Sequence, residues 1–328
     1  KEAYVEITGD RRVSGDLRDS DMVRMRESLG DRFVESLTSA SWANVLGDSM
    51  TRRMLAEYAQ ATDLQAWRKI ASPVPVNDFR TQERTRVGGY GNLPGVGQGA
   101  PYGALASPGD EKASYAVTKR GGTEDVTLEM IRNDDVGAIR RIPTALAMAA
   151  ANTLYEFVFD FIRSNPVIYD TVALFHATHN NLGTTALDAT SFAAARLAMV
   201  NQVRAGSLKK LNLGPATVLV PFELQEAAYN LFVRNQNLDK TFVQTINPEV
   251  IAVPYWTDAN DWAEVADPRR IKTIEIGFLD GREEPELFVQ DTPNVGSLFS
   301  NDKITYKIRH IYSGAVMDFR GLRKHVVA

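Results

Sequence analysis

The chain has 328 residues, of which 44% are hydrophobic and 24% are charged, a composition that is ordinary for a soluble globular protein. Its formal net charge of −4 argues against a dedicated DNA-binding protein, because such proteins normally present a strongly basic face. The chain contains no cysteine, which excludes disulfides, thiolate metal sites and cysteine nucleophiles.

Residues 1–75 predict an arm followed by a helix. The first 35 residues hold seven basic and nine acidic side chains and few large apolar ones, which favours an extended or loosely helical arm. From Ser41 apolar residues recur near helical spacing, which is typical of an amphipathic helix. Pro73 and Pro75 end the helical pattern, because proline removes a backbone donor and pushes the chain toward extended geometry.

Residues 76–126 predict a long hairpin with a glycine-rich tip. Two polar strands, 79–87 and 112–120, flank a segment that has eight glycines and three prolines between residues 87 and 111. Because neither strand is apolar enough for a core, we expect the hairpin to project and to lie on other chains. The tip residues expected to make these contacts are Gly91, Asn92, Leu93, Pro94, Gly95, Gly97, Gly99, Pro101, Tyr102 and Gly103.

A glycine-rich loop can instead bind phosphate, but this one lacks the required context. A P-loop needs Gly-Lys followed by Ser or Thr, and the dipeptide Gly-Lys occurs nowhere in the chain. A dinucleotide fingerprint needs a helix after the glycines, which Pro94, Pro101 and Pro108 forbid. We therefore predict no nucleotide or other cofactor.

Residues 127–165 predict a long helix, in which about thirty helical residues span roughly 45 Å at 1.5 Å per residue. Asp134 or Asp135 caps its start, Pro166 follows its end, and Pro143 kinks it or joins a first turn to the main rod. One apolar stripe is expected to contain Ile139, Ile142, Leu146, Ala149, Thr153, Phe157 and Phe161.

The rest of the chain alternates short strands and helices. Ser191 is expected to cap one helix, and a strand ending at residue 221 leads into another. Residues 272–291 predict a hairpin that turns near Asp280 and Gly281, and the C-terminal residues alternate as a closing strand pair. No apolar run reaches about 18 residues, so no membrane span is predicted.

Catalytic and metal chemistry has weak support. His176 and His179 lie three residues apart, but a zinc site needs three or four ligands, and the other histidines are distant in the sequence. The pattern Gly-x-Ser-x-Gly is absent, which leaves Ser-His-Asp catalysis without its usual turn. We predict no catalytic or metal-binding residues.

Two arginine pairs are the candidates for charged contacts between chains. These are Arg140 with Arg141 and Arg269 with Arg270. They lie either on solvated faces or in ion pairs between subunits, since a charge in an assembly can meet its partner on a neighbour.

Three stretches carry a family resemblance: RGGTEDVTLEMIRNDDVGAIRRIP after the hairpin, then LFHATHNN, then ADPRRIKTIEIGFLDGREEPELFV. From about Ser41 to its C-terminus the chain resembles the major capsid proteins of tailed phages, in particular the Mu-like major head subunits. The resemblance implies an α+β fold of the Hong Kong 97 capsid type. Its parts would be an N-terminal arm and helix at 1–75, an E-loop hairpin at 76–126, a P-domain spine helix at 127–165, an A-domain at 166–299 and P-domain return strands at 300–328.

The resemblance also implies a structural, non-enzymatic shell protein. Such a protein self-assembles as pentamers and hexamers into an icosahedral shell around double-stranded DNA, with a portal and decoration proteins as further partners and no membrane. It is expected in the virion after assembly in the host cytoplasm. The non-methionine start at Lys1 is similar to what maturation proteases leave in this family, although simple trimming also accounts for it.

Two alternatives stay open at this point. One is an encapsulin-like nanocompartment of the same fold, which would enclose a cargo enzyme instead of DNA. The other is a metal-dependent hydrolase that uses His176 and His179.

Overall fold

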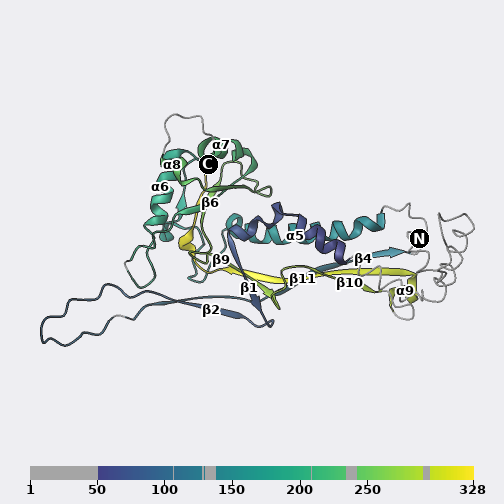
Figure 1. Cartoon of the computed structure of the whole chain (residues 1–328), viewed down its shortest axis with the longest axis horizontal. Coiled ribbons are helices and arrows are strands. Elements are labelled where there is room, and N and C mark those ends of the chain that lie inside the picture. Colours follow the sequence, from purple (N-terminus) through teal and green to yellow (C-terminus); the bar gives the residue numbers. More distant parts are fainter. Residues whose placement is uncertain are drawn as a thin grey trace, which may run out of the picture. The chain divides into compact units, whose positions relative to one another are not determined.

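The structure is a computed structural model that describes residues 51–105, 107–127, 129, 138–207, 209–233, 242–290 and 296–328. The predicted arm, Lys1, Asp134 and Asp135 lie outside these ranges, whereas residues 51–60 of the predicted N-terminal helix are helical. The chain divides into two compact units (Figure 1). Unit 1 takes its described residues from 51–58, 121–147 and 286–309, and unit 2 from 59–120, 148–285 and 310–328.

Unit 1 is built on the N-terminal half of one long strand, β11 (Lys303–Val316). β10 (Glu286–Gln290) pairs antiparallel with it, β4 (Thr118–Thr127) also pairs with β11, and the short helix α9 (Ser297–Asn301) precedes it. Val126 and Tyr306 are buried there against Ile142 of α5 (Ala138–Ser164).

Unit 2 contains a first sheet that uses the other half of β11. β1 (Ala71–Val76) follows the 3₁₀ helix η1 (Asp63–Lys69) and runs parallel to β9 (Ile274–Leu279). β9 in turn pairs antiparallel with residues 312–316 of β11. The first five residues of β9 are all buried, so this strand is covered on both of its faces.

A second sheet of unit 2 has the strand order β5-β12-β8-β6-β7. These strands are Leu182–Gly183, Leu322–His325, Trp262–Ala266, Pro215–Val220 and Glu249–Ala252. The helices α6 (Ala189–Val200), α7 (Gln225–Phe232) and α8 (Phe242–Ile246) gather around this sheet, and the shorter 3₁₀ helices are η2 (Ala177–His179), η3 (Phe222–Leu224) and η4 (Phe319–Gly321) (Figure 1).

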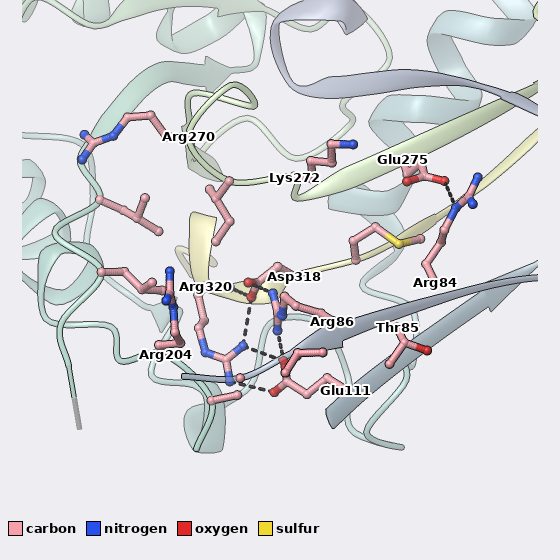
Figure 2. A pocket seen from close by; sticks show the side chains of 17 residues that line it. Arg84, Thr85, Arg86, Glu111, Arg204, Arg270, Lys272, Glu275, Asp318 and Arg320 are labelled. Atoms are coloured by element: carbon pink, nitrogen blue, oxygen red, sulfur yellow. Dashed lines mark hydrogen bonds and ion pairs between the residues drawn. The ribbon is translucent and has the colours of Figure 1, made fainter. Parts of the chain in front are cut away.

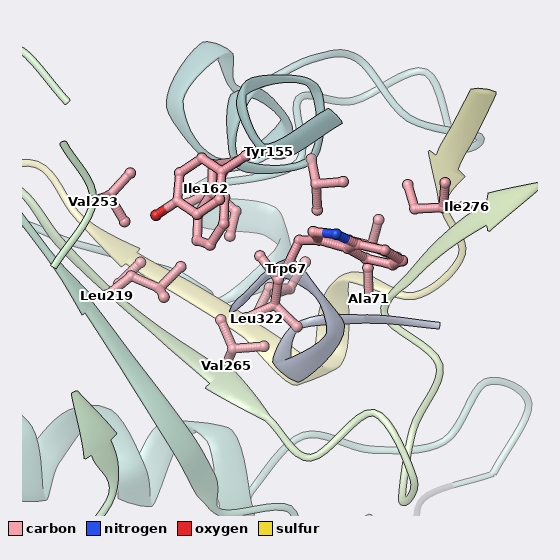
Figure 3. Close-up of a cluster of buried hydrophobic side chains, with 14 of the residues drawn as sticks. Trp67, Ala71, Tyr155, Ile162, Leu219, Val253, Val265, Ile276 and Leu322 are labelled. Carbon is pink, nitrogen blue, oxygen red and sulfur yellow. The ribbon is translucent and has the colours of Figure 1, made fainter. Parts of the chain in front are cut away.

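The C-terminal half of α5 forms one wall of the main core. Val158 and Ile162 are fully buried and belong to the same cluster as Trp67, Ile276 and Leu219, so this cluster joins the helix to both sheets (Figure 3). By length and hydropathy, residues 141–164 meet the criterion for a membrane-spanning helix. A core helix meets the same criterion, and here the apolar face packs against protein.

The long helix is confirmed, but the predicted stripe is wrong by about one residue in its middle. Ala149 and Thr153 are exposed and Leu146 is half-buried. The buried positions are Ala147, Ala151, Leu154, Tyr155, Val158, Phe159 and Ile162. The alanine-rich sequence is apolar on several faces, so its periodicity did not identify which face meets the sheets.

Three local predictions also need correction. Asp188, not Ser191, caps α6, because its carboxylate accepts the Ser191 N–H at 2.7 Å. The turn at Asp280 and Gly281 exists, with φ of 54° and 69°, yet β9 and β10 do not form a hairpin because β11 lies between them in the strand order. The last two strands are not a pair, since β12 lies in the second sheet.

One buried carboxyl group stands out in the second sheet. Glu264, in the middle of β8, is fully buried, and neither of its carboxylate oxygens has a hydrogen-bond partner among the described residues. Burial raises the pKa of Glu264 to about 8, although the charges of Arg323 and Arg196 act in the opposite direction. The folded protein therefore keeps this carboxyl protonated at neutral pH.

We expect Val158→Asp to prevent folding, because it places a charge in the main core at a cost of several kcal/mol. Thr153→Asp on the exposed face of the same helix is the matched control and should keep most of the stability. Circular dichroism and thermal unfolding of both full-length variants test this. Equal melting temperatures for the two variants would contradict the assigned buried face.

Glu264→Gln should stabilise the protein increasingly as pH rises. The unfolded chain loses the Glu264 proton near about pH 4.3, whereas the folded chain keeps it up to about pH 8, so folding stability falls across this window. The difference in melting temperature between Glu264→Gln and the parent should grow from pH 5 to about pH 8 and then level off. A difference that stays constant with pH would show that Glu264 is already ionised in the fold.

Candidate functional site

The predicted hairpin is present, and its paired part is shorter than the sequence suggested. β2 (Gln82–Val87) pairs antiparallel with β3 (Asp110–Tyr115), from Gln82 opposite Tyr115 to Val87 opposite Asp110. Beyond this stalk the Gly88 N–H donates to the Gly109 carbonyl at 2.9 Å, and the chain between them forms the tip. After Tyr115 the chain leaves the hairpin and enters β4, which pairs with β11.

The tip exposes large apolar side chains to solvent. Tyr102 is 89% exposed and Leu93 is 78% exposed. The others are Tyr90, Val96 and Leu105. Exposed apolar groups gathered on one segment mark a surface that contacts another molecule.

The tip glycines are not required by crowding within the chain. A side chain at Gly91, Gly95, Gly97 or Gly103 would meet no atom within 4 Å. Only Gly99 has a positive φ, at 75°, which other residues rarely adopt. Crowding within the described part of the chain therefore does not explain why glycine occupies these positions.

The base of the hairpin, in contrast, is fixed to the body of unit 2. The Gly89 N–H donates to the Ala205 carbonyl at 2.9 Å. A side chain at Gly88 would collide with the backbone of Ala205, and Gly206 (φ 67°) lies against Pro108 and Gly109. These contacts require glycine because backbone meets backbone.

An ion-pair cluster also anchors the stalk. Arg86 of β2 pairs with Glu111 of β3 and with Asp318, which caps η4. Arg320 of η4 donates to both oxygens of Glu111 at 3.0 and 2.8 Å and to Asp318 at 3.2 Å (Figure 2). We call Arg86, Glu111, Asp318 and Arg320 the stalk cluster. It joins both hairpin strands to a turn more than 200 residues away in the sequence.

A second polar contact lies further along the stalk. Glu275 of β9 is 4% exposed and accepts hydrogen bonds from Arg84 Nε and from the Tyr115 hydroxyl, both at 2.7 Å. The expectation that the hairpin contacts almost only other subunits is therefore wrong for the stalk. Charged strand residues looked solvated in the sequence, but their partners are supplied by β9 and η4.

A cavity of about 640 Å³ lies at the base of the hairpin, within unit 2. Arg84, Arg86, Arg204, Arg270, Lys272 and Arg320 line it together with the carboxylates of Glu111, Glu275 and Asp318 (Figure 2). Cations thus outnumber carboxylates on its walls. The sequence analysis missed this site, although Arg84 and Arg86 share one face of β2 by their spacing of two residues.

The four arginines predicted to make charged contacts have different settings. The Arg140 side chain lies outside the described residues, and Arg141 is exposed. Arg269 is exposed, and its backbone N–H donates to the Asp267 carboxylate at 2.8 Å. Arg270 lines the cavity and donates to the Asn212 carbonyl at 2.8 Å. Their predicted contacts with other subunits stay predictions.

The two histidines considered for metal binding build a loop instead. His179 is buried, contacts the Leu174 carbonyl at 3.0 Å and Asp170 at 2.6 Å, and stacks on Phe319. His176 Nδ1 accepts the Thr178 N–H, as a helix cap does. Within the described ranges, no group of three or more His, Asp or Glu side chains is placed to hold a metal ion. The histidine pair therefore gives no support to a hydrolase.

A family model described as "Phage capsid protein" matches residues 110–325. The chain belongs to this family. No curated protein sequence matches the chain. The match covers β3, the long helix, β11, the second sheet of unit 2 and, apart from β1, the first sheet, while β2 and the hairpin tip lie outside it.

Solved structures show the same fold at low sequence identity. Chains of Microbacterium phage Oxtober96 and Mycobacterium phage Bobi have TM-scores of 0.55 with 11% and 15% identity. These matches cover 80% and 81% of this chain, and 91% and 90% of the phage chains. A chain titled "Capsid of native GTA particle computed with C5 symmetry" has a TM-score of 0.58 and 11% identity over 81% of this chain and 90% of its own length.

The predicted α+β fold of the Hong Kong 97 capsid type is thereby confirmed. This phage capsid protein is a structural subunit that assembles with copies of itself into a shell and is a component of the virion. Its assignment to the Mu-like head subunits stays a prediction. The identification of the hairpin as the E-loop stays a prediction.

Arg320→Met should loosen the hairpin stalk without unfolding the sheets. It removes one partner of the buried Asp318 and of Glu111, so Gln82–Val87 and Asp110–Tyr115 should exchange their amide hydrogens at least about tenfold faster, equivalent to about 1.4 kcal/mol. Hydrogen exchange measured by mass spectrometry on the unassembled full-length chain checks this.

Lys112→Met is the matched control, because it breaks only the exposed ion pair with Glu83 on the same hairpin. The control should exchange like the parent. If Arg320→Met does so too, the stalk cluster does not hold the hairpin.

Proposed function

We propose that this capsid protein is the major head subunit and that the hairpin tip covers a neighbouring subunit in the shell. The observation that carries the proposal is the tip itself, with Leu93 and Tyr102 almost fully exposed at the end of a firmly anchored stalk. Burying one large apolar side chain contributes about 1.5–3 kcal/mol. A few such contacts, repeated in every subunit of a closed shell, give a large total.

The glycine content of the tip fits this role. Subunits of a closed icosahedral shell occupy pentamers and hexamers, so the same hairpin must reach neighbours at slightly different angles. Glycines without crowded surroundings, such as Gly91, Gly95 and Gly97, permit this adjustment. Pro94 and Pro101 limit the number of free conformations and thus the entropy lost on contact.

The domain division follows the same proposal. Residues 1–75 form the N-terminal arm and helix, 76–126 the E-loop hairpin, 127–165 the P-domain spine helix and 166–299 the A-domain. Of residues 300–328, β11 returns to the P-domain, while the pairing of β12 with β8 favours adding that strand to the A-domain.

The content of the shell is proposed to be double-stranded DNA, held by enclosure. A net charge of −4 favours loose enclosure, because phosphate repulsion keeps the polymer mobile. A portal and decoration proteins complete the proposed partners, with assembly in the host cytoplasm. The chain is proposed to act without catalysis or a cofactor.

Removing residues 91–105 should abolish stable shells while leaving the subunit folded. The deletion keeps the Gly88–Gly109 hydrogen bond that closes the stalk and removes the exposed tip. Circular dichroism should match the parent, and electron microscopy should show few or no closed particles. Intact particles in normal yield would contradict the proposed role of the tip.

A milder variant separates the apolar contact from loop length. Leu93→Ser with Tyr102→Ser keeps the full tip and should lower the heat resistance of the particles, whereas Asn92→Ser is the polar control.

The content of the particles is a separate test. Nucleic acid extracted from parent particles supports the head-protein proposal. Particles filled with a cargo enzyme would instead favour the encapsulin-like alternative.

A further inference from the structure

The cavity at the base of the hairpin carries more positive charge than the chain itself neutralises. Six cationic side chains line it, against three carboxylates. All three carboxylates are already engaged, Glu111 and Asp318 in the stalk cluster and Glu275 with Arg84 and Tyr115. The excess charge thus belongs to cations outside these pairs.

Those cations are Arg204, Arg270 and Lys272. Among the described residues, no carboxylate forms an ion pair with any of the three, and Arg270 reaches only the Asn212 carbonyl. Arg204 comes from the loop that fixes the hairpin base, and the other two from the connection between β8 and β9. Side chains from two separate segments therefore present unneutralised charge to one cavity (Figure 2).

The interior of the cavity is also built to keep its charges in place. Arg320 is 8% exposed and Asp318 is 3% exposed, so this wall is largely shielded from water. Burial lowers the pKa of Arg86, and the neighbouring guanidinium groups of Arg320 and Arg204 lower it further. Arg204, Arg270 and Lys272 are themselves exposed, so an anion reaches them from solvent and each single contact with them is weak.

We propose that this cavity binds an acidic side-chain segment of a second copy of the chain. The inference rests on the proposed function, because a closed shell presents copies to one another at high effective concentration. The chain has 41 acidic against 37 basic residues, so a neighbouring copy offers carboxylates in excess. Guanidinium groups bind carboxylates with two parallel hydrogen bonds, which suits Arg204 and Arg270.

A protein carboxylate fits the cavity better than nucleic acid does. The net charge of −4 of the whole chain disfavours the close approach of a continuous polyphosphate chain. An acidic segment with more than one carboxylate can contact cations on separate parts of the wall, since the Arg270 and Lys272 side chains point apart (Figure 2). Arg204 lies in the loop that is hydrogen-bonded to Gly89 at the base of the stalk. A neighbouring subunit bound to Arg204 would therefore also stabilise the position of the stalk.

Zero-length cross-linking tests the proposal directly. A carbodiimide joins a carboxylate to an amine only when the two are in contact, and Lys272 supplies an amine in the cavity. Arg204→Lys and Arg270→Lys place amines at the other two positions. Particles assembled from a mixture of unlabelled and ¹⁵N-labelled chains then distinguish links between copies, which have mixed isotope content, from links within one copy.

We expect mixed-isotope links from these amines to Asp or Glu residues. The links formed by Lys272 should disappear in Lys272→Arg, which removes the amine and keeps the positive charge. Lys209 is the background control, because it is exposed on the same loop as Arg204 and does not line the cavity. Arg204→Glu combined with Lys272→Glu should raise the subunit concentration needed for assembly at least about tenfold, whereas Lys209→Glu should change it by less than about twofold.

Closed particles whose cavity amines give only links within one copy, or none, would overturn the inference and leave the proposed function standing. Protection of these amines from acetylation in filled but not in emptied particles would assign the cavity to nucleic acid phosphates and overturn it as well. Failure of the parent chain to form closed particles would count against the proposed function itself, and this inference would fall with it.

Discussion

The hairpin of this capsid protein depends on the stalk cluster, in which Arg86, Glu111, Asp318 and Arg320 hold two strands against a turn near the C-terminus. Buried ion pairs of this kind add little to stability relative to apolar packing, since desolvation offsets much of the attraction. Their directional hydrogen bonds instead select one geometry. In this chain they fix the direction in which the hairpin extends from the rest of unit 2.

An anchored stalk and an uncovered tip divide the hairpin into parts with different physical demands. At the base, Gly88 and Gly206 meet backbone atoms so closely that a side chain would not fit. At the tip, Gly91 and Gly97 have open space around them, and the apolar side chains of Leu93 and Tyr102 face solvent. A subunit built to be joined to copies of itself is expected to hold the base rigidly and to complete the tip only on contact.

In contrast to the tip, the main core of unit 2 is covered by its own side chains. The buried face of α5, with Val158 and Ile162, contacts strands of both sheets, and Trp67 fills the space beside β1. One buried carboxyl, Glu264, interrupts the apolar second sheet and remains protonated because of its burial. Rigid packing here gives the projecting elements a fixed platform.

The sequence by itself determined the elements that local chemistry controls. The glycine and proline content identified the tip, and an alanine-rich sequence identified the long helix. The order of the elements, together with a few motifs, identified the capsid family. The sequence also argued against a P-loop and a dinucleotide fingerprint, because both depend on local spacing that is absent.

Only the tertiary structure decided which distant residues meet. The structure showed that the buried face of α5 contains Val158 and that β11 lies between β9 and β10. It also showed that Arg86 pairs with Asp318 and that Glu275 pairs with Arg84. The physical reason is that register and ion pairing are set by neighbours far away in the sequence, while periodicity records only one element at a time. The cavity at the hairpin base exists for the same reason, since its cations come from β2, the loop before β6, the connection after β8 and η4.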